Sequence, residues 1–353
     1  MYLEIYLTLS RIISFLGFLV NLTLHVSLTY ITLYKVKKID FGYKLLVLVF
    51  TELCMVLSLI GMLIHPFYHT YNAGLIAFNT VSYRIIPKFL INIAMAAYSG
   101  VCLAIISFFS ILFAFRFWTM TNSHWALRFK NWKSLTLTPY AALVGILSTY
   151  SFIHFGSIDK VAEDYFREAL AENYNVTIEN VTGNAIIAFM PNATGKWYQR
   201  IHWNSYLLTH FIISTMTFQF IVVAYCGARM HYKMSDMIES LSPASRRLQT
   251  QFFKCLILQI TPPILTIFLP TLVILCIPYL NLQIDFPTGI VVVLFNLYPV
   301  FDSCIMIVII SEYRTAMRNL FEKLVMSPLD WLTRDREAAQ RNDIQLQTFA
   351  SLE

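Results

Sequence analysis

Two acidic residues lie inside long apolar runs of this sequence, where a charge is costly. Glu52 falls within the run 45–65, and Asp302 falls within the run 290–311. Ionisable residues in such runs are rare and commonly functional. At 1.5 Å of rise per residue, both carboxylates are expected about 12–15 Å deep in a helix, where they could share one polar layer with Asn21. We interpret this layer either as a hub that re-pairs when helices move or as a static packing contact.

Glutamines and prolines extend this polar layer. Gln259 precedes a double proline, and Gln219 is expected at a similar depth in another apolar run. Each proline removes a backbone donor and bends a helix, and the two amides could bond the carbonyls that the bends free. Such bends suit a bundle that opens on its inner side, although simple helix geometry explains them equally well. The prolines concerned are Pro262, Pro263, Pro270 and Pro299.

Patterns for catalysis and metal binding are weak. His65 and His69 have the i, i+4 spacing of a metal pair, but no third ligand is evident, and a helix end with a turn at Pro66 explains them better. The sequence has no phosphate-binding glycine loop, no HExxH and no GxSxG. Its six cysteines fall within apolar runs without CxxC spacing. We therefore expect no cofactor, no metal and no enzyme, with a protease that uses Glu52 and Asp302 as the only enzymatic alternative.

The elements that position these residues follow from composition. Of the 353 residues, 57% are hydrophobic and 13% are charged, whereas soluble domains carry about 25% charged residues. A helix needs about 20 apolar residues to cross a bilayer. The sequence therefore predicts an all-α membrane protein, a seven-transmembrane helix bundle. The seven predicted helices are Tyr6–Tyr34, Leu45–His65, Phe89–Phe115, Leu135–Phe155, Trp203–Ala228, Phe252–Ile277 and Ile290–Ser311.

Lysine and arginine counts predict the orientation of this bundle. One set of loops, together with the C-terminal segment, carries nineteen basic residues, and the other set carries seven. Because the basic side of a membrane protein faces the cytoplasm, the N-terminus is predicted outside and the C-terminus inside. The basic loops have this ordinary explanation, so no nucleic acid partner is implied.

A long polar loop, 156–202, is predicted outside and is expected to be glycosylated. It holds three acceptor sequons, at Asn175, Asn180 and Asn192. None of the six cysteines lies in this loop, so no disulfide can tether it. The sequon at Asn21 lies inside a predicted helix and should remain unmodified.

After the seventh helix, apolar residues recur at helical spacing and basic residues flank them. This pattern predicts an amphipathic helix over 312–326 on the inner leaflet. We assign 1–326 to the transmembrane domain and 327–353 to a mobile cytoplasmic tail. The apolar residues of the helix are Met317, Leu320, Phe321, Leu324 and Val325, flanked by Arg314, Arg318 and Lys323.

Six stretches follow one another in order along about 300 residues: Phe41–Leu46, Pro66–His69, Leu248–Phe253, Gln259–Pro263, Tyr298–Asp302 and Glu312–Arg314. Together they resemble the nematode serpentine chemoreceptors of the Str group, which are related to the Srj and Srd groups. The resemblance implies a G-protein-coupled chemosensory receptor in the ciliary membrane of a sensory neuron. Two features depart from familiar patterns. Arg116 has no adjacent acid, unlike the arginine of rhodopsin-like receptors, and Ser303 follows Asp302 where the family often has proline.

The receptor hypothesis assigns roles to both ends of the bundle. A small odorant or metabolite would enter between the outer halves of helices three, five, six and seven. Asn92, Tyr98 and His210 are the polar groups expected to contact it. The ligand would favour a state with splayed inner ends, and would shift that balance by its differential affinity for the two states. The residues that this state would expose to a heterotrimeric G protein are Arg116, Arg246, Arg247 and Arg314.

A channel or transporter is the alternative function. Such proteins usually show repeats, broken helices or rings of charge, and we find no repeat and two buried acids. A seven-helix channel of the insect olfactory type would place its N-terminus inside, against the charge count. The sequence therefore favours the receptor.

Overall fold

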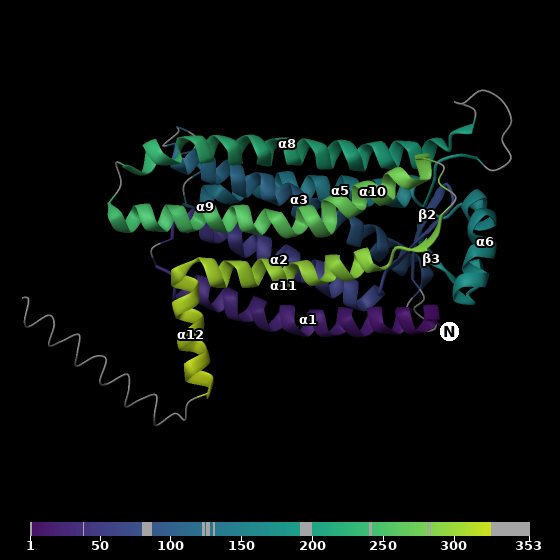
Figure 1. Ribbon diagram of the computed structural model, residues 1–353, viewed down its shortest axis with the longest axis horizontal. Helices are drawn as coiled ribbons and strands as arrows, with labels where there is room; N and C mark the ends of the chain where they lie inside the picture. Colours follow the sequence, from purple (N-terminus) through teal and green to yellow (C-terminus); the bar gives the residue numbers. More distant parts are fainter. Residues whose placement is uncertain are drawn as a thin grey trace, which may run out of the picture.

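The computed structural model describes residues 2–37, 39–79, 87–121, 124, 128–129, 131–190, 200–239, 242–280, 282 and 284–325. Seven of its helices are long and apolar enough to cross a membrane, which confirms the predicted bundle (Figure 1). The predicted tail 327–353 and the sequon Asn192 lie outside the described residues. The spans are α1 (Tyr2–Tyr34), α2 (Phe41–Ile64), α3 (Lys88–Met120), α5 (Thr138–Phe155), α8 (Trp203–Glu239), the pair α9 (Pro243–Pro263) and α10 (Leu269–Cys276), and α11 (Ile290–Ile309).

The predicted bend in the sixth span is a change of helix type. α9 ends at Pro263, a π-helical turn follows at Ile264–Phe268, and α10 continues from Leu269. Figure 1 shows that α10 leaves α9 at a visible angle. Because successive prolines cannot donate to the helix ladder, a wider turn accommodates the backbone there. Pro299 lies inside the single helix α11.

The third and fourth spans, α3 and α5, pack with their backbones close together. A side chain at Gly100 of α3 would come within 2.1 Å of Thr149 Oγ1 and 2.7 Å of the Gly145 carbonyl of α5. Glycine therefore allows α3 and α5 to touch along their backbones, as small residues do in membrane bundles.

One end of the bundle carries a small sheet that the sequence analysis did not predict. Its four antiparallel strands are β1 (Phe67–Tyr71), β2 (Gly74–Asn79), β3 (Thr182–Ile187) and β4 (Asp285–Pro287), in the order β3-β2-β1-β4. The β1–β2 turn contains Asn72 with a φ of 47°, a conformation that Asn tolerates. We call this end, where α1 also begins, the sheet end (Figure 1).

The loop 156–202, predicted as a polar loop, contains ordered elements. It holds α6 (Lys160–Tyr174) and strand β3, which pairs with β2 along its whole length. Phe166, Leu170 and Tyr174 of α6 pack on Ile76 and Phe78 of β2 in a second hydrophobic core. Backbone pairing thus holds the loop in place without a disulfide.

The opposite end carries α12 (Ser311–Val325), which runs across the bundle (Figure 1). Tyr313 is buried, and its hydroxyl lies 3.0 Å from Thr32 Oγ1 of α1. Met317 and Leu320 pack against the main core, whereas Phe321 is 65% exposed. We call this end the α12 end.

Candidate functional site

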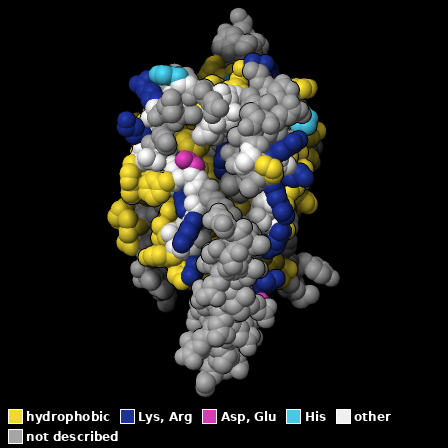
Figure 2. Space-filling model, turned by 90° about the vertical axis from the view of Figure 1, so that its left-hand side faces the viewer, with side chains coloured by type: hydrophobic (Ala, Val, Ile, Leu, Met, Phe, Trp, Pro, Cys, Tyr) yellow, Lys and Arg dark blue, Asp and Glu magenta, His cyan; other side chains and the backbone are white. Residues whose placement is uncertain are grey.

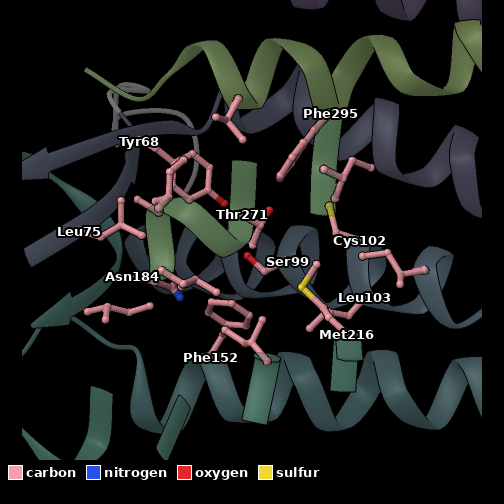
Figure 3. Close-up of a pocket in the computed structure, with 18 residues that line it drawn as sticks. Tyr68, Leu75, Ser99, Cys102, Leu103, Phe152, Asn184, Met216, Thr271 and Phe295 are labelled. Carbon is pink, nitrogen blue, oxygen red and sulfur yellow. The ribbon is translucent and has the colours of Figure 1, made fainter. Parts of the chain in front are cut away.

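An apolar cavity of about 90 Å³ lies inside the bundle, next to the sheet. Its walls come from five helical spans and three strands (Figure 3). Helix α3 contributes Ser99 and Cys102, and α10 contributes Thr271. Strands β1 and β3 contribute Tyr68 and Asn184, so the sheet closes the cavity on its side.

Four polar side chains interrupt the apolar lining of this cavity. The hydroxyls of Tyr68, Ser99 and Thr271 point toward one another in Figure 3. Tyr68 and Ser99 form a side-chain hydrogen bond, and burial raises the pKa of the Tyr68 phenol. Asn184 is 6% exposed, and neither of its amide atoms has a hydrogen-bond partner. The arrangement is an apolar chamber with a few fixed polar groups, as is typical of small-molecule sites.

The residues predicted to contact the ligand do not line this cavity. Tyr98 points elsewhere and donates to Asn296 Oδ1 at 2.9 Å, while Asn296 Nδ2 donates to Ser14 Oγ at 2.9 Å. This chain of bonds ties α3, α11 and α1 together. Asn92 lies at a separate hollow on the rim, and His210 is exposed on α8, with Nδ1 2.9 Å from the Tyr206 carbonyl oxygen. Asn92, Tyr98 and His210 therefore lie on helices that border the cavity, with their side chains directed away from it.

The expected layer joining Glu52, Asp302 and Asn21 is also corrected. The Glu52 side chain is 59% exposed and its Oε1 lies 3.3 Å from His25 Nε2. Glu52 shares its helix face with Val56 and Leu59, which are exposed as well. Asn21 is buried and contacts the Met55 sulfur. Spacing along the sequence predicts how deep Glu52 and Asp302 lie in the bundle. It does not predict the direction of each side chain, and Glu52 points outward whereas Asp302 points into the core.

Asp302 instead joins α11 to α9. Gln259 Nε2 donates to Asp302 Oδ1 at 3.0 Å, and the Tyr298 hydroxyl lies 3.5 Å from the same oxygen. Cys255 donates to Gln259 Oε1 at 3.4 Å. Asp302, Gln259, Tyr298 and Cys255 are all buried. We call these four residues the Asp302 link.

Gln219 belongs to a different contact. It accepts a hydrogen bond from Ser110 of α3 at 2.6 Å and donates to the Tyr140 hydroxyl of α5 at 2.5 Å. From the sequence, Gln219 and Gln259 could each bond a backbone carbonyl freed by a proline. In the structure, neither side chain makes such a bond. Both amides connect side chains of neighbouring helices.

The arginines assigned to the inner face divide into one buried and three exposed residues. Arg116 is 4% exposed, and its guanidinium lies over the Tyr43 ring at 3.6 Å from the ring centre. Arg246, Arg247 and Arg314 are exposed, and Arg314 donates to the Val308 carbonyl at 2.8 Å. Figure 2 views this end and shows Lys and Arg side chains around its rim, with few acidic side chains.

Two of the predicted glycosylation sites are accessible. Asn175 caps the end of α6 with a φ of 52°, and Asn180 follows in a short 3-10 turn. Both side chains are exposed. At the sheet end, His65 caps α2, and His69 lies in β1 with its ring nitrogens next to Tyr174 and Asp285. Among the described residues, no cluster of three potential metal ligands occurs.

The fold is a seven-helix bundle of the rhodopsin type. The structure aligns with the crystal structure of squid rhodopsin with a TM-score of 0.56, covering 95% of this chain and 91% of that chain at 11% identity.

The family description "Serpentine type 7TM GPCR chemoreceptor Str" matches residues 10–318, and this chain belongs to that family. It is similar to the G-protein coupled receptor str-33 of Caenorhabditis elegans, 30% identical over 89% of this chain and 91% of the relative. It is also similar to the serpentine receptor class r-10 of the same organism, 26% identical over 90% and 92% of the two chains. These matches identify a multi-pass membrane chemoreceptor and specify the Str group.

Proposed function

We propose that this receptor binds a small external molecule in the cavity beside the sheet and activates a heterotrimeric G protein at its α12 end. The apolar cavity, walled in part by α3, α8, α10 and α11, is the observation that carries this proposal. It lies between the helices at which the sequence hypothesis places the ligand. A ligand there would touch Thr271 and Ile274 on α10, directly beyond the π-helical turn that joins α10 to α9.

The proposed orientation places the sheet end outside the cell. Two exposed sequon asparagines lie at that end, and the excess of basic residues lies at the other. The receptor would then lie in the plasma membrane, with α12 along the inner leaflet and the segment 327–353 in the cytoplasm. By resemblance to the family, the membrane is that of a sensory cilium.

At the α12 end, the proposed change is an exposure of Arg116. The buried guanidinium rests on Tyr43 of α2, where a rhodopsin-like receptor would offer an adjacent acid. Outward movement of α9 would uncover Arg116 beside the exposed Arg246, Arg247 and Arg314. These four arginines form the proposed G-protein contact.

The test is G-protein activation by wild type and Arg116→Ala in cells, with a panel of small odorants and metabolites. We expect a ligand response in wild type that Arg116→Ala loses while surface expression is kept. Asn131→Gly, an exposed substitution near the same end, is the matched control and should respond normally. Ionic current that persists without any G protein would contradict the receptor and favour the alternative, a ligand-gated channel or transporter.

A further inference from the structure

The amide of Asn184 is a buried polar group that faces the cavity with both hydrogen-bonding atoms unsatisfied. The side chain lines the cavity (Figure 3), it is 6% exposed, and neither Oδ1 nor Nδ2 has a partner. Buried polar groups are normally hydrogen-bonded, and leaving one unpaired is costly. A ligand that bonds both atoms would remove that cost.

Two of the three neighbouring hydroxyls are already engaged within the chain. Ser99 Oγ donates to the Met95 carbonyl at 3.4 Å, and Ser99 also bonds the Tyr68 hydroxyl. The third hydroxyl, that of Thr271, carries its donor and its acceptor on one atom. Asn184 is the polar side chain of the lining that offers a donor and an acceptor on two adjacent atoms.

The rest of the lining limits the charge and size of the ligand. Among the described residues that line the cavity, none is charged. A carboxylate or an ammonium group would enter without a counterion, which is strongly unfavourable. The volume of about 90 Å³ is smaller than the roughly 150 Å³ of an engineered apolar cavity that holds benzene. The ligand is therefore neutral and has only a few non-hydrogen atoms.

We propose that the cavity selects neutral, short-chain molecules whose head carries a donor and an acceptor side by side, namely primary carboxamides and undissociated carboxylic acids. The ligand carbonyl accepts from Asn184 Nδ2, while the ligand N–H or O–H donates to Asn184 Oδ1. The alkyl chain lies against apolar lining such as Met216, Ile274 and Phe295. This inference rests on the proposed ligand-binding role of the cavity and adds the chemical class of the ligand.

The first test compares ligands of equal size on the full-length receptor purified in lipid nanodiscs. Butanamide, butanoic acid, pentan-2-one and pentan-1-ol have the same number of non-hydrogen atoms, and their Kd values can be measured from the ligand-induced rise in Tm. The ketone has a hydrogen-bond acceptor but no donor. The alcohol has its donor and its acceptor on the same oxygen, so it cannot bond both atoms of the Asn184 amide side by side. We expect butanamide to bind about tenfold or more tightly than either. Butanoic acid should bind under acidic conditions and lose affinity as it ionises.

The second test assigns the preference to Asn184. Asn184→Leu keeps a similar volume without hydrogen-bonding atoms, so it should bind butanamide and pentan-2-one equally. Asn92→Leu, at the separate hollow on the rim, is the matched control and should keep the preference. If Asn184→Leu does not fold, the wild-type series still decides whether the amide is favoured over the ketone.

Three results would overturn the inference: equal binding of amide and ketone by wild type, a preference that survives Asn184→Leu, or no binding of any of the four probes. G-protein activation is measured in parallel to separate this inference from the proposed function. Butanamide that binds without activating would leave the ligand class standing and count against coupling. Activation by other ligands, with no preference for the amide, would support G-protein coupling and count against the proposed ligand class.

Discussion

The two ends of this receptor are held together by different kinds of contact. At the sheet end, three segments far apart in the sequence meet through backbone hydrogen bonds, and α6 covers them with its own core. Toward the α12 end, the main hydrophobic core continues, and the polar contacts between helices are single side-chain contacts such as Arg116 over Tyr43, the Asp302 link, and Tyr313 with Thr32.

This difference suits a receptor. A cooperative sheet keeps the cavity walls fixed, so little binding energy is lost in ordering them. Individual side-chain contacts contribute about 1 kcal/mol each, and a shift of that size changes a two-state equilibrium about fivefold. We therefore expect substitutions at the sheet end to affect folding, and substitutions near the α12 end to affect basal signalling.

The largest effect is expected at Gly183 of β3. A Cβ there would lie 1.8 Å from the Ala77 carbonyl oxygen, so Gly183→Val should separate β3 from β2. We expect a loss of about 3 kcal/mol or more in the free energy of unfolding, seen as lost surface expression and a lower Tm. Gly227→Ala of α8, whose nearest neighbour would lie at 3.4 Å, is the control and should express normally. Normal expression of Gly183→Val would refute the view that the β2–β3 pairing holds the sheet end together.

The next effect is expected at the Asp302 link. Gln259→Leu removes the 3.0 Å donor to Asp302 and leaves a buried acceptor with a weaker partner, at a cost of about 1–3 kcal/mol. Because this bond joins α9 to α11, we expect ligand-independent GTPγS binding by the G protein to rise about tenfold. Thr261→Val, an exposed substitution on the same helix, is the control and should leave ligand-independent GTPγS binding unchanged. Lower basal activity in Gln259→Leu would show that the link stabilises the active state instead.

A smaller effect is expected at Tyr43. Tyr43→Leu removes the ring beneath Arg116, and a cation–π contact is worth about 0.5–2 kcal/mol. Basal signalling should rise severalfold. Tyr43→Phe keeps the ring and loses only the hydroxyl that bonds Arg116, so its basal signalling should lie between those of wild type and Tyr43→Leu. Equal signalling by both variants would mean that the stacking contact does not restrain Arg116.

The smallest effect concerns the pH dependence of the sheet end. His69 is buried, its Nδ1 lies 3.0 Å from the Tyr174 hydroxyl, and its Nε2 lies 3.1 Å from Asp285 Oδ1 without hydrogen-bond geometry. Burial lowers the pKa of His69, and the Asp285 carboxylate opposes that shift. The folded state therefore binds fewer protons than the unfolded state, so the contribution of His69 to stability is complete above about pH 6.5 and declines below it.

Thermal unfolding across this range should show Tm falling on acidification, and His69→Gln should reduce the slope. His210→Gln, on the exposed face of α8, is the control. A slope that is unchanged in His69→Gln would assign the acid sensitivity to other groups.

The sequence predicted the seven spans because runs of about 20 apolar residues match the thickness of a bilayer and are too long for most soluble folds. It did not predict the sheet, since its strands are three to six residues long and pair across distant segments. Tyr68 and Asn184 reach the cavity only through that pairing, so spacing within one helix could not find them. The sequence predicted Tyr98 as a ligand contact, but its neighbour Ser99 lines the cavity instead. Successive residues of a helix differ in direction by about 100°, so an error of one residue selects a different face.

Glu52 lies on the exposed stripe of α2. Glu52, Val56, Leu59 and Leu63 follow one another at helical spacing and are all exposed. Because the buried face of this helix is also largely apolar, spacing alone does not show that Glu52 points away from Asp302. The Asp302 link itself needed the contact between α9 and α11, which only the three-dimensional structure provides.

The central claim is that filling the cavity at the sheet end opens the α12 end. The most direct measurement is the distance between spin labels at Tyr34 of α1 and Lys254 of α9, both exposed and outside the proposed G-protein contact, in a background that lacks the exposed Cys304. Distances are compared without ligand, with the tightest-binding probe, and with that probe plus nucleotide-free G protein. We predict a population with a longer distance that grows in that order. An unchanged distance distribution in all three states would contradict the account.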